Sequence, residues 1–212
     1  GDSMSGVHQH GTSGWGDTIG SATFTLFNAH RQSLLATLGM SFPTGSVDEK
    51  VGDTFTHYGM QLGSGTFDLL PSVTYLGQAD RISWGLQYAS TLRLEDENES
   101  GFRFGNVHGV TGWTAFRICD WASVSGRIAY RHEGQISGHY NGAHEHGSPP
   151  DFQSNYGGDT LDLGVGVNLY APKGALKGNR LAIEVLFPVY QDLNGVQVER
   201  DFTLAAGWQW AF

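Results

Sequence analysis

The 212-residue chain has a single cysteine, Cys119, so it forms no disulfide within itself and has no cysteine-rich metal site. It is also poor in charge: Asp, Glu, Lys and Arg make up 16% of it, against roughly 25% in typical soluble domains. Lys and Arg number 12 against 21 Asp and Glu, and the formal net charge is -9. A basic surface that neutralises phosphates is therefore excluded, and we expect no nucleic-acid partner.

Long hydrophobic runs are missing as well. No stretch reaches the about 18 consecutive apolar residues of a transmembrane helix, and the mean hydropathy is -0.27. A helical membrane protein is therefore excluded, but a transmembrane β-barrel is not, because only alternate residues of its strands face lipid. Glycine is abundant, with 31 residues, and aromatic residues make up 12% of the chain. This composition favours many strands joined by turns.

The stretch from Asp201 to Phe212 shows the clearest pattern in the chain. Its even-numbered residues are apolar and mostly large, whereas its odd-numbered residues are small or polar. Alternation with a period of two indicates a β-strand with one apolar face. Aromatic rings are enriched where strands meet the membrane surface. We therefore predict Trp208, Trp210 and Phe212 as membrane anchors.

Eight further segments alternate in the same way, so we predict an all-β protein with nine antiparallel strands. The predicted strands are Thr18–Phe27, Ser33–Phe42, Thr66–Leu76, Ile82–Leu94, Phe102–Ile118, Ala122–Arg131, Thr160–Leu169, Arg180–Val189 and Asp201–Phe212. Several reach the about ten residues that cross a bilayer at a tilt, whereas strands of soluble proteins usually have about five or six. The face opposite the apolar one is rich in Gly, Ala and Ser. This favours an antiparallel transmembrane β-barrel over a soluble sandwich or lipocalin-like barrel.

The links between the predicted strands alternate between short turns and longer polar loops. If the last strand ends at the periplasmic face, all the long loops are extracellular. Bacterial single-chain barrels have an even number of strands, so we expect that an odd number, about three, precede these nine in a barrel of about 12. Residues 1–15 are then an extracellular loop or a remnant of a truncated N-terminal part, and residues 16–212 form transmembrane strands.

Five segments carry a resemblance to a known family. They are "LGMSFPTGSVDE" (Leu38 to Glu49), "MQLGSGTFDLLPSVTYLGQ" (Met60 to Gln78), "LDLGVGVNL" (Leu161 to Leu169), "GNRLAIEVLFPVYQDLNGVQ" (Gly178 to Gln197) and "GWQWAF" (Gly207 to Phe212). From about Gly14 onward, the chain resembles the outer-membrane transporter-like barrels grouped with the meta-pathway phenol-degradation proteins. The resemblance implies an outer-membrane barrel, often of about a dozen strands, that passes small or hydrophobic molecules. Family members usually have additional strands before the matched region.

Charged residues on the face opposite the apolar one are the candidates for lining a lumen. They are Asp68, Arg93, Arg127, Arg131, Glu133, Asp162, Arg180, Glu184 and Asp201. In a narrow barrel we expect them to pair, because a lone buried charge is costly. The pairs either select solutes in a polar lumen or fill the interior as a structural plug. Small residues on the same face, such as Gly164, Gly166 and Gly207, leave space and favour a passage.

Histidines are the candidates for binding a metal. His8 and His10 lie near Met4, and His144 and His146 flank Glu145. Imidazole and thioether groups suit Cu or Zn, and this spacing places two ligands near one ion. The alternative interpretation is that these are exposed polar residues of loops without a fixed scaffold. We expect no cofactor.

A catalytic site is not indicated by the sequence. His132 with Glu133, and His108, are available as bases, but no spacing marks a nucleophile with a base and an orienting group. We therefore expect no enzymatic activity. The tryptophans lie mostly near predicted strand ends, where amphipathic rings settle at headgroup depth. They are Trp15, Trp84, Trp113, Trp121, Trp208 and Trp210.

The sequence therefore predicts a porin-like protein of the cell outer membrane of a Gram-negative bacterium. We expect a channel or passive transporter for small molecules, including hydrophobic or aromatic ones. The alternative is a non-transporting structural or surface-binding barrel, whose loops contact ions, lipid or a partner. The expected partners are the lipid bilayer and lipopolysaccharide, the barrel-assembly machinery through the C-terminal strand, and a small-molecule solute.

Overall fold

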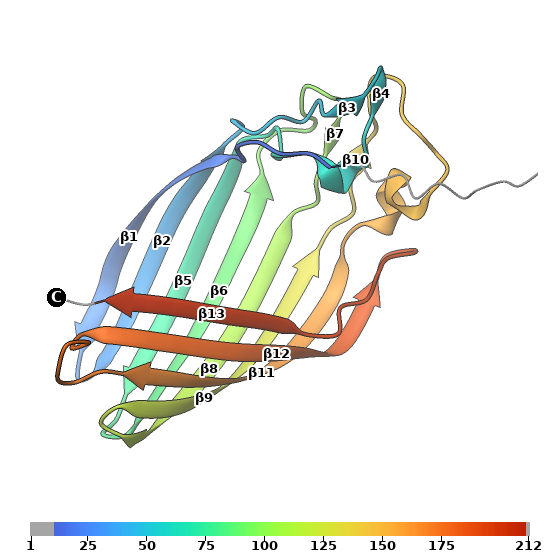
Figure 1. Cartoon of the computed structure of the whole chain (residues 1–212). Coiled ribbons are helices and arrows are strands. Elements are labelled where there is room, and N and C mark those ends of the chain that lie inside the picture. Colours follow the sequence, from blue (N-terminus) through green and yellow to red (C-terminus); the bar gives the residue numbers. More distant parts are fainter. Residues whose placement is uncertain (1–10, 211–212) are drawn as a thin grey trace, which may run out of the picture.

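A computed structural model describes residues 11–210, which form one nine-stranded antiparallel sheet that curves around a concave face (Figure 1). Neighbours in the sheet follow the order of the chain. The strands are β1 (Thr18–Ala29), β2 (Gln32–Phe42), β5 (Asp68–Gln78), β6 (Ile82–Arg93), β8 (Val107–Cys119), β9 (Ala122–Glu133), β11 (Gly158–Tyr170), β12 (Asn179–Leu193) and β13 (Thr203–Trp210). The prediction of an all-β protein with nine antiparallel strands is thus confirmed.

Short links join the strands at one end of the sheet, the turn end, and long loops join them at the other, the loop end. The turn-end links cover residues 30–31, 79–81, 120–121 and 171–178, and the loops cover residues 43–67, 94–106, 134–157 and 194–202. In the first link His30 and Arg31 both adopt positive φ, 51° and 64°. Positive φ at both positions is the geometry of a two-residue hairpin that follows the strand twist. The predicted alternation of short and long links is therefore present.

One predicted strand is shorter than expected. The stretch from Phe102 to Ile118 divides into β7 (Phe102–Arg103), which pairs with β10 (Ser137–Gly138), and β8, which begins at Val107. Phe102 is 0% exposed and packs against aromatic residues of other loops. Its apolar character thus comes from burial within the loops and not from a lipid-facing strand position.

The loops at the loop end have a hydrophobic core of their own. Its buried members are Phe55, Tyr58, Phe102, Ile136 and Tyr140. The Tyr140 ring stacks on Phe55 and Tyr58, with ring centroids 4.2 and 4.4 Å apart. These residues come from β4 (Thr54–Phe55), η1 (Tyr58–Met60) and the segments around β7 and β10. The core therefore joins three loops that are far apart in the sequence.

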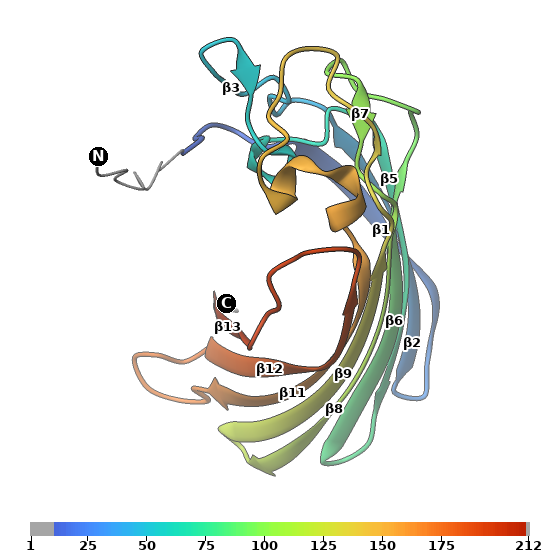
Figure 2. The ribbon, with the colours of Figure 1, turned by 90° about the vertical axis from the view of Figure 1, so that its right-hand side faces the viewer.

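The helical elements are short and lie in the same loops. Besides η1 they are η2 (Pro149–Asp151) and η3 (Gln153–Asn155); one further short hairpin pairs β3 (Lys50–Val51) with β4. In Figure 2 the orange turns of η2 and η3 lie within the curve of the sheet, at its loop end. Among residues 11–210, no helix combines the length and the apolar character that a membrane crossing demands.

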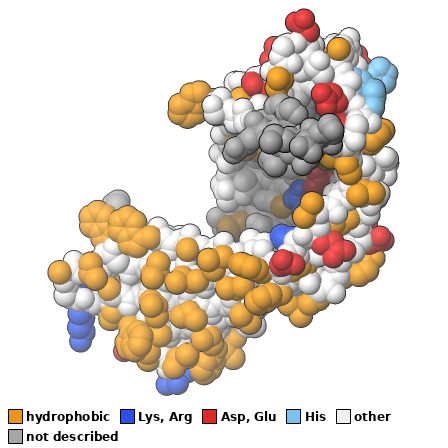
Figure 3. Space-filling model, turned by 45° about the vertical axis from the view of Figure 1, so that its right-hand side comes forward, with side chains coloured by type: hydrophobic (Ala, Val, Ile, Leu, Met, Phe, Trp, Pro, Cys, Tyr) orange, Lys and Arg blue, Asp and Glu red, His pale blue; other side chains and the backbone are white. Residues whose placement is uncertain are grey.

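The convex face of the sheet is apolar. Leu86 and Val165 are typical of it, with 53% and 64% of their surfaces exposed. Figure 3 shows hydrophobic side chains over the outer surface of the strands, and acidic and histidine side chains gathered at the loop end. An apolar area that spans a whole sheet is unusual for a soluble monomer and marks an interaction surface.

The sheet has two free edges. β1 and β13 each pair with one neighbour, and they do not pair with each other. The described residues thus form an open, curved sheet. The predicted closure into a barrel of about 12 strands requires partners for these two edges.

Candidate functional site

The centre of the concave face is an ion pair that lies against an aromatic ring. Arg127 on β9 donates from Nε to Oε1 of Glu184 on β12, at 2.8 Å, and from Nη1 to the hydroxyl of Thr111 on β8, at 3.2 Å. Its guanidinium carbon lies 5.5 Å from the ring centroid of Trp113. A guanidinium that pairs with a carboxylate and stacks on a ring keeps a defined orientation. The middle of this face is therefore charge-balanced and ordered.

Glycine makes room for this ring. Gly85 on β6 is the register partner of Trp113, and a Cβ atom at that position would overlap the indole ring. Trp113 therefore lies on the concave face in the middle of β8, and the prediction that places it at headgroup depth is wrong. Sequence alternation is weak in β8 because Gly and Thr occupy both of its faces.

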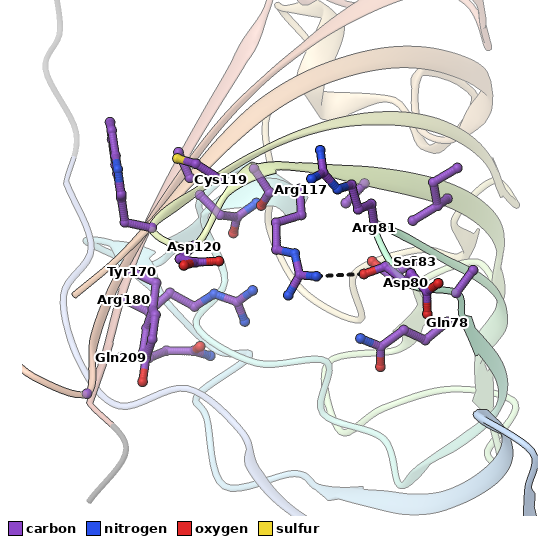
Figure 4. Close-up of a pocket in the computed structure, with 18 of the residues that line it drawn as sticks. Gln78, Asp80, Arg81, Ser83, Arg117, Cys119, Asp120, Tyr170, Arg180 and Gln209 are labelled. Carbon is purple, nitrogen blue, oxygen red and sulfur yellow. Dashed lines mark hydrogen bonds between the residues drawn. The ribbon is translucent and has the colours of Figure 1, made fainter. Parts of the chain in front are cut away.

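A cavity of about 770 Å³ occupies the concave face at the turn end (Figure 4). Three arginines line it, namely Arg81, Arg117 and Arg180. Arg117 donates from Nη2 to the backbone carbonyl of Asp80 at 2.8 Å. The Asp80 carboxylate itself accepts from Nη1 of Arg31 at 2.6 Å. This hydrogen bond and the positive charge of Arg31 lower the pKa of Asp80 below its ordinary value.

An adjoining cavity of about 610 Å³ links the turn end to the centre of the concave face. It shares Arg180 with the first cavity and extends to Arg127 and Glu184. Sequence reasoning identified Arg127, Arg180 and Glu184 as lumen candidates and missed the other arginines. Arg31 and Arg81 lie in turns, where strand alternation gives no signal, and Arg117 lies on the strand whose faces were ambiguous.

Toward the loop end, three more ion pairs lie on the concave side. Asp68 is 2% exposed, pairs with Arg93 and accepts hydrogen bonds from the hydroxyls of Ser64 and Thr66, at 3.0 and 2.6 Å. The other two pairs are Arg131 with Glu133, at 2.6 Å, and Arg200 with Asp162, at 2.8 Å. Four of the five predicted acids thus meet an arginine, which lies on another strand for Asp68 and Glu184, on the same strand for Glu133 and in a loop for Asp162.

Arg200 was not among the predicted residues, and its neighbour Asp201 was. The predicted strand began at Asp201, whereas β13 begins at Thr203. Asp201 is exposed in the preceding loop and makes no ion pair with any residue in the range 11–210. The loop before β13 instead turns Arg200 toward Asp162 on β11.

The histidines that were candidates for metal binding lie in the loop 134–157. The rings of His144 and His146 are 4.3 Å apart, and Nδ1 of His144 lies 3.1 Å from the Gly142 carbonyl oxygen. No group of three or more His, Cys, Asp or Glu side chains converges anywhere within residues 11–210. His8 and His10 lie outside the described residues, so the metal site stays a prediction.

A row of polar and aromatic side chains crosses the convex face near the loop end. Tyr88 and His108 are joined at 2.9 Å, His132 and Asp159 at 2.9 Å, and Tyr130 donates to the same Asp159. The row crosses the adjacent strands β6, β8, β9 and β11. Between this row and the turn end, the convex face is apolar. We refer to these five residues as the polar row.

Two histidines of the polar row were the candidate bases for catalysis. His132 bonds to Asp159, whereas its sequence neighbour Glu133 pairs with Arg131 on the other face of β9. His108 bonds to the Tyr88 hydroxyl, and its register partner Ser90 makes no hydrogen bond to it. The expected absence of an enzymatic activity stays a prediction.

The predicted membrane anchors lie at the turn end of the convex face. Trp208 is 70% exposed and donates from Nε1 to the Asn179 side chain at 2.8 Å, and Trp210 is likewise exposed. Phe212 lies outside the described residues. The exposed tryptophans and the polar row thus lie at opposite ends of the apolar face.

Comparison with known proteins gives a likeness of fold. No family model matches the chain, and no curated protein matches it. Among solved structures, the chain is similar to an outer membrane channel from Pseudomonas putida F1, with a TM-score of 0.61 and 13% sequence identity. The match covers 90% of this chain and 64% of that channel, so the chain spans less than two thirds of its length.

The chain shares its fold with an outer membrane channel. At 13% identity the likeness concerns the arrangement of strands and not the side chains that line the concave face. It supports the predicted outer-membrane fold, but not the narrower resemblance to the meta-pathway proteins, which stays a prediction. The concave face, with its two cavities and its arginines, is the candidate functional site of the chain.

Proposed function

We propose that this chain forms most of a closed β-barrel that carries small solutes passively across the outer membrane of a Gram-negative bacterium. One observation carries the proposal: the convex face is apolar across the sheet, whereas the concave face is lined by charged and small residues. In water this arrangement would expose the apolar convex face to solvent. In a membrane the apolar face meets lipid and the polar face surrounds a lumen.

The two ends of the apolar face suggest how the barrel lies in the membrane. Trp208 and Trp210 suit the interface at the turn end, since amphipathic rings prefer headgroup depth. The polar row suits the opposite interface, where its hydroxyl, imidazole and carboxylate groups meet lipid and lipopolysaccharide headgroups. The turn end would then be periplasmic and the long loops extracellular.

Closure requires further strands. Backbone groups on the free edges of β1 and β13 would be unsatisfied in hydrocarbon, at a cost of several kcal/mol for each group. We propose that about three more strands close the barrel, which gives the even number of about 12. The edge of β13 is also the natural contact for the barrel-assembly machinery.

Conductance tests the proposal. The purified full-length protein, inserted into planar lipid bilayers, is expected to give stepwise currents, and proteoliposomes are expected to swell in solutions of small sugars or aromatic solutes. The heat-denatured protein is the control for detergent leakage. A folded protein that gives neither current nor swelling would refute the proposed channel function.

The second candidate, a non-transporting structural or surface-binding barrel, is favoured by one observation. The aromatic core of the loops and the adjacent η2 and η3 lie at the loop end, within the curve of the sheet (Figure 2). If these loops close the lumen, the barrel conducts nothing and its loops act as a binding surface. A folded protein that gives no current in the bilayer experiment would support this candidate.

A further inference from the structure

The two cavities of the concave face are basic in an acidic protein. The chain carries a formal net charge of -9. The cavities are lined by five arginines, at positions 31, 81, 117, 127 and 180, but by three acids only, at positions 80, 120 and 184. In contrast, the acidic run from Glu95 to Glu99 lies in a loop at the loop end. Positive charge is therefore concentrated inside the curve of the sheet at the turn end.

Three of these arginines, at positions 81, 117 and 180, make no ion pair within residues 11–210, and two of them, Arg117 and Arg180, extend into the cavity. Arg127 and Arg31 already pair with carboxylates. The Arg117 side chain hydrogen-bonds only to a backbone carbonyl, that of Asp80, and Arg180 makes no ion pair with any residue that the structure describes. Figure 4 shows both guanidinium groups extending into the cavity, Arg117 from β8 and Arg180 from β12. Both side chains are exposed and thus open to solute.

The surroundings of Arg180 suit a carboxylate attached to a planar group. Tyr170 on β11 is its register partner and Gln209 on β13 lies opposite, and both line the cavity. A guanidinium fork binds a carboxylate through two parallel hydrogen bonds, and a phenol ring offers a flat apolar surface beside it. The cavity volume of about 770 Å³ lies within the usual range of small-molecule sites.

We infer that the turn-end cavity binds small organic carboxylates through Arg117 and Arg180, and that it makes the lumen selective for anions. The inference rests on the proposed channel, because it assigns a solute class to the same lumen. The concentrated positive charge raises the local concentration of anions, and the guanidinium groups of Arg117 and Arg180, which make no ion pair within the described residues, bind the carboxylate of a passing solute.

Ion selectivity is the first test. The full-length protein in planar bilayers under a KCl gradient is expected to give a reversal potential that reports a preference for Cl⁻ over K⁺. The double variant Arg117→Gln with Arg180→Gln is expected to lose most of this preference. The matched control is Lys173→Gln with Lys177→Gln, which removes the same charge in the β11–β12 link, from residues that do not line the cavities.

Binding is the second test, and it does not depend on conductance. Titration of the detergent-solubilised protein with benzoate is expected to give saturable binding, weakened roughly tenfold in the double arginine variant and unchanged in the lysine control. Acetate and inorganic phosphate are compared in parallel. Tighter binding of phosphate than of benzoate would overturn the assignment to carboxylates.

The outcomes separate the inference from the proposed function. Conductance with a preference for K⁺, or a Cl⁻ preference that the arginine variant retains, would overturn the inference and leave the channel intact. Benzoate binding by a protein that conducts nothing would support the site and refute the channel. Heat-modifiable migration on a gel shows whether the variants are folded, and Arg117→Lys with Arg180→Lys provides a folded variant that keeps the charge but not the fork.

Discussion

Asp151 shows how single residues hold the loop end together. Its side chain is buried and accepts hydrogen bonds from the Ser148 backbone N–H and hydroxyl, both at 2.8 Å. Its other oxygen lies 2.6 Å from Nδ1 of His57. His57 immediately precedes η1, so the contact joins the loop 134–157 to the loop 43–67. Two segments that are far apart in the sequence thus meet at one carboxylate.

The pKa of Asp151 makes this contact dependent on pH. Burial by itself raises this pKa, but the hydrogen bonds from Ser148 and His57 together outweigh it, and the pKa lies below its ordinary value of 3.8. A lowered carboxyl pKa contributes stability that is present above the unfolded-state pKa and is lost as the pH falls through the folded-state value. The contribution is therefore complete near pH 7, begins to fall near the unfolded-state pKa of about 4 and is lost as the pH falls through the lower folded-state pKa.

We predict that Asp151→Asn removes a pH-dependent step in the near-ultraviolet circular dichroism of the loops. The stacked rings of Tyr58 and Tyr140 supply the signal, which in the unmodified protein is expected to decrease as the pH falls below about 4. The exposed Asp96, replaced by Asn, is the control. An acid transition that persists unchanged in Asp151→Asn would contradict the prediction.

At the scale of elements, β6, β8 and β9 are held together by side chains that pack against one another on the concave face. Gly85 on β6 leaves the space in which the Trp113 ring of β8 lies, and Arg127 of β9 covers that ring. Strand pairing sets which residues face each other, and side-chain volume sets which pairs fit. At Gly85 the small residue of the polar face thus makes room for a neighbouring side chain. Elsewhere a small residue leaves open space, as at Gly207, where nothing lies within 4 Å of an added Cβ.

We predict that Gly85→Ala destabilises the protein by about 1 to 3 kcal/mol, because the new methyl group displaces the Trp113 ring from Arg127. Denaturant unfolding in detergent measures the change, and the tryptophan emission spectrum reports the displacement. Gly207→Ala is the matched control, since its added methyl group meets open space. Equal effects of the two substitutions would show that the space at Gly85 does not matter.

At the scale of the whole molecule, the orientation of the two faces decides between a membrane barrel and a soluble one. Leu86 and Gln87 are neighbours on β6 and point to opposite faces. Leu86 is exposed on the convex face, whereas Gln87 donates to Thr74 on the concave face at 2.8 Å. The same substitution, made at each of these two positions of one strand, therefore tests which face of the sheet meets lipid.

We predict that Leu86→Lys destabilises the protein in lipid vesicles by about 2 to 4 kcal/mol, as expected for a cation placed on the lipid face. Gln87→Lys is expected to cost about 1 kcal/mol, through loss of its hydrogen bond to Thr74. Urea titration of vesicle-inserted protein measures both. A larger cost at Gln87 than at Leu86 would mean that the concave face is the dry core of a soluble barrel.

The strands were predictable because each carries its own signal. A period of two over about ten residues is local, so the positions of β1, β11 and β12 follow from sequence alone. Several charged residues of the concave face, such as Arg127 and Asp162, followed from the same alternation. Contacts with a turn or a loop did not follow from it: Asp162 meets Arg200, 38 positions away, and neither Asp80 nor its partner Arg31, 49 positions away, was predicted. Strand alternation carries no information about contacts with a turn or a loop.

The sequence by itself determined the number of strands, their antiparallel order and the apolar character of one face, since these depend on neighbours along the chain. Only the tertiary structure decided that Trp113 lies inside, that Phe102 is buried in a loop core, and that arginines from two turns and three strands line joined cavities. The physical reason is the curvature of the sheet. It brings the ends of distant strands around one hollow, and it is set by pairing across the whole sheet rather than by any single strand.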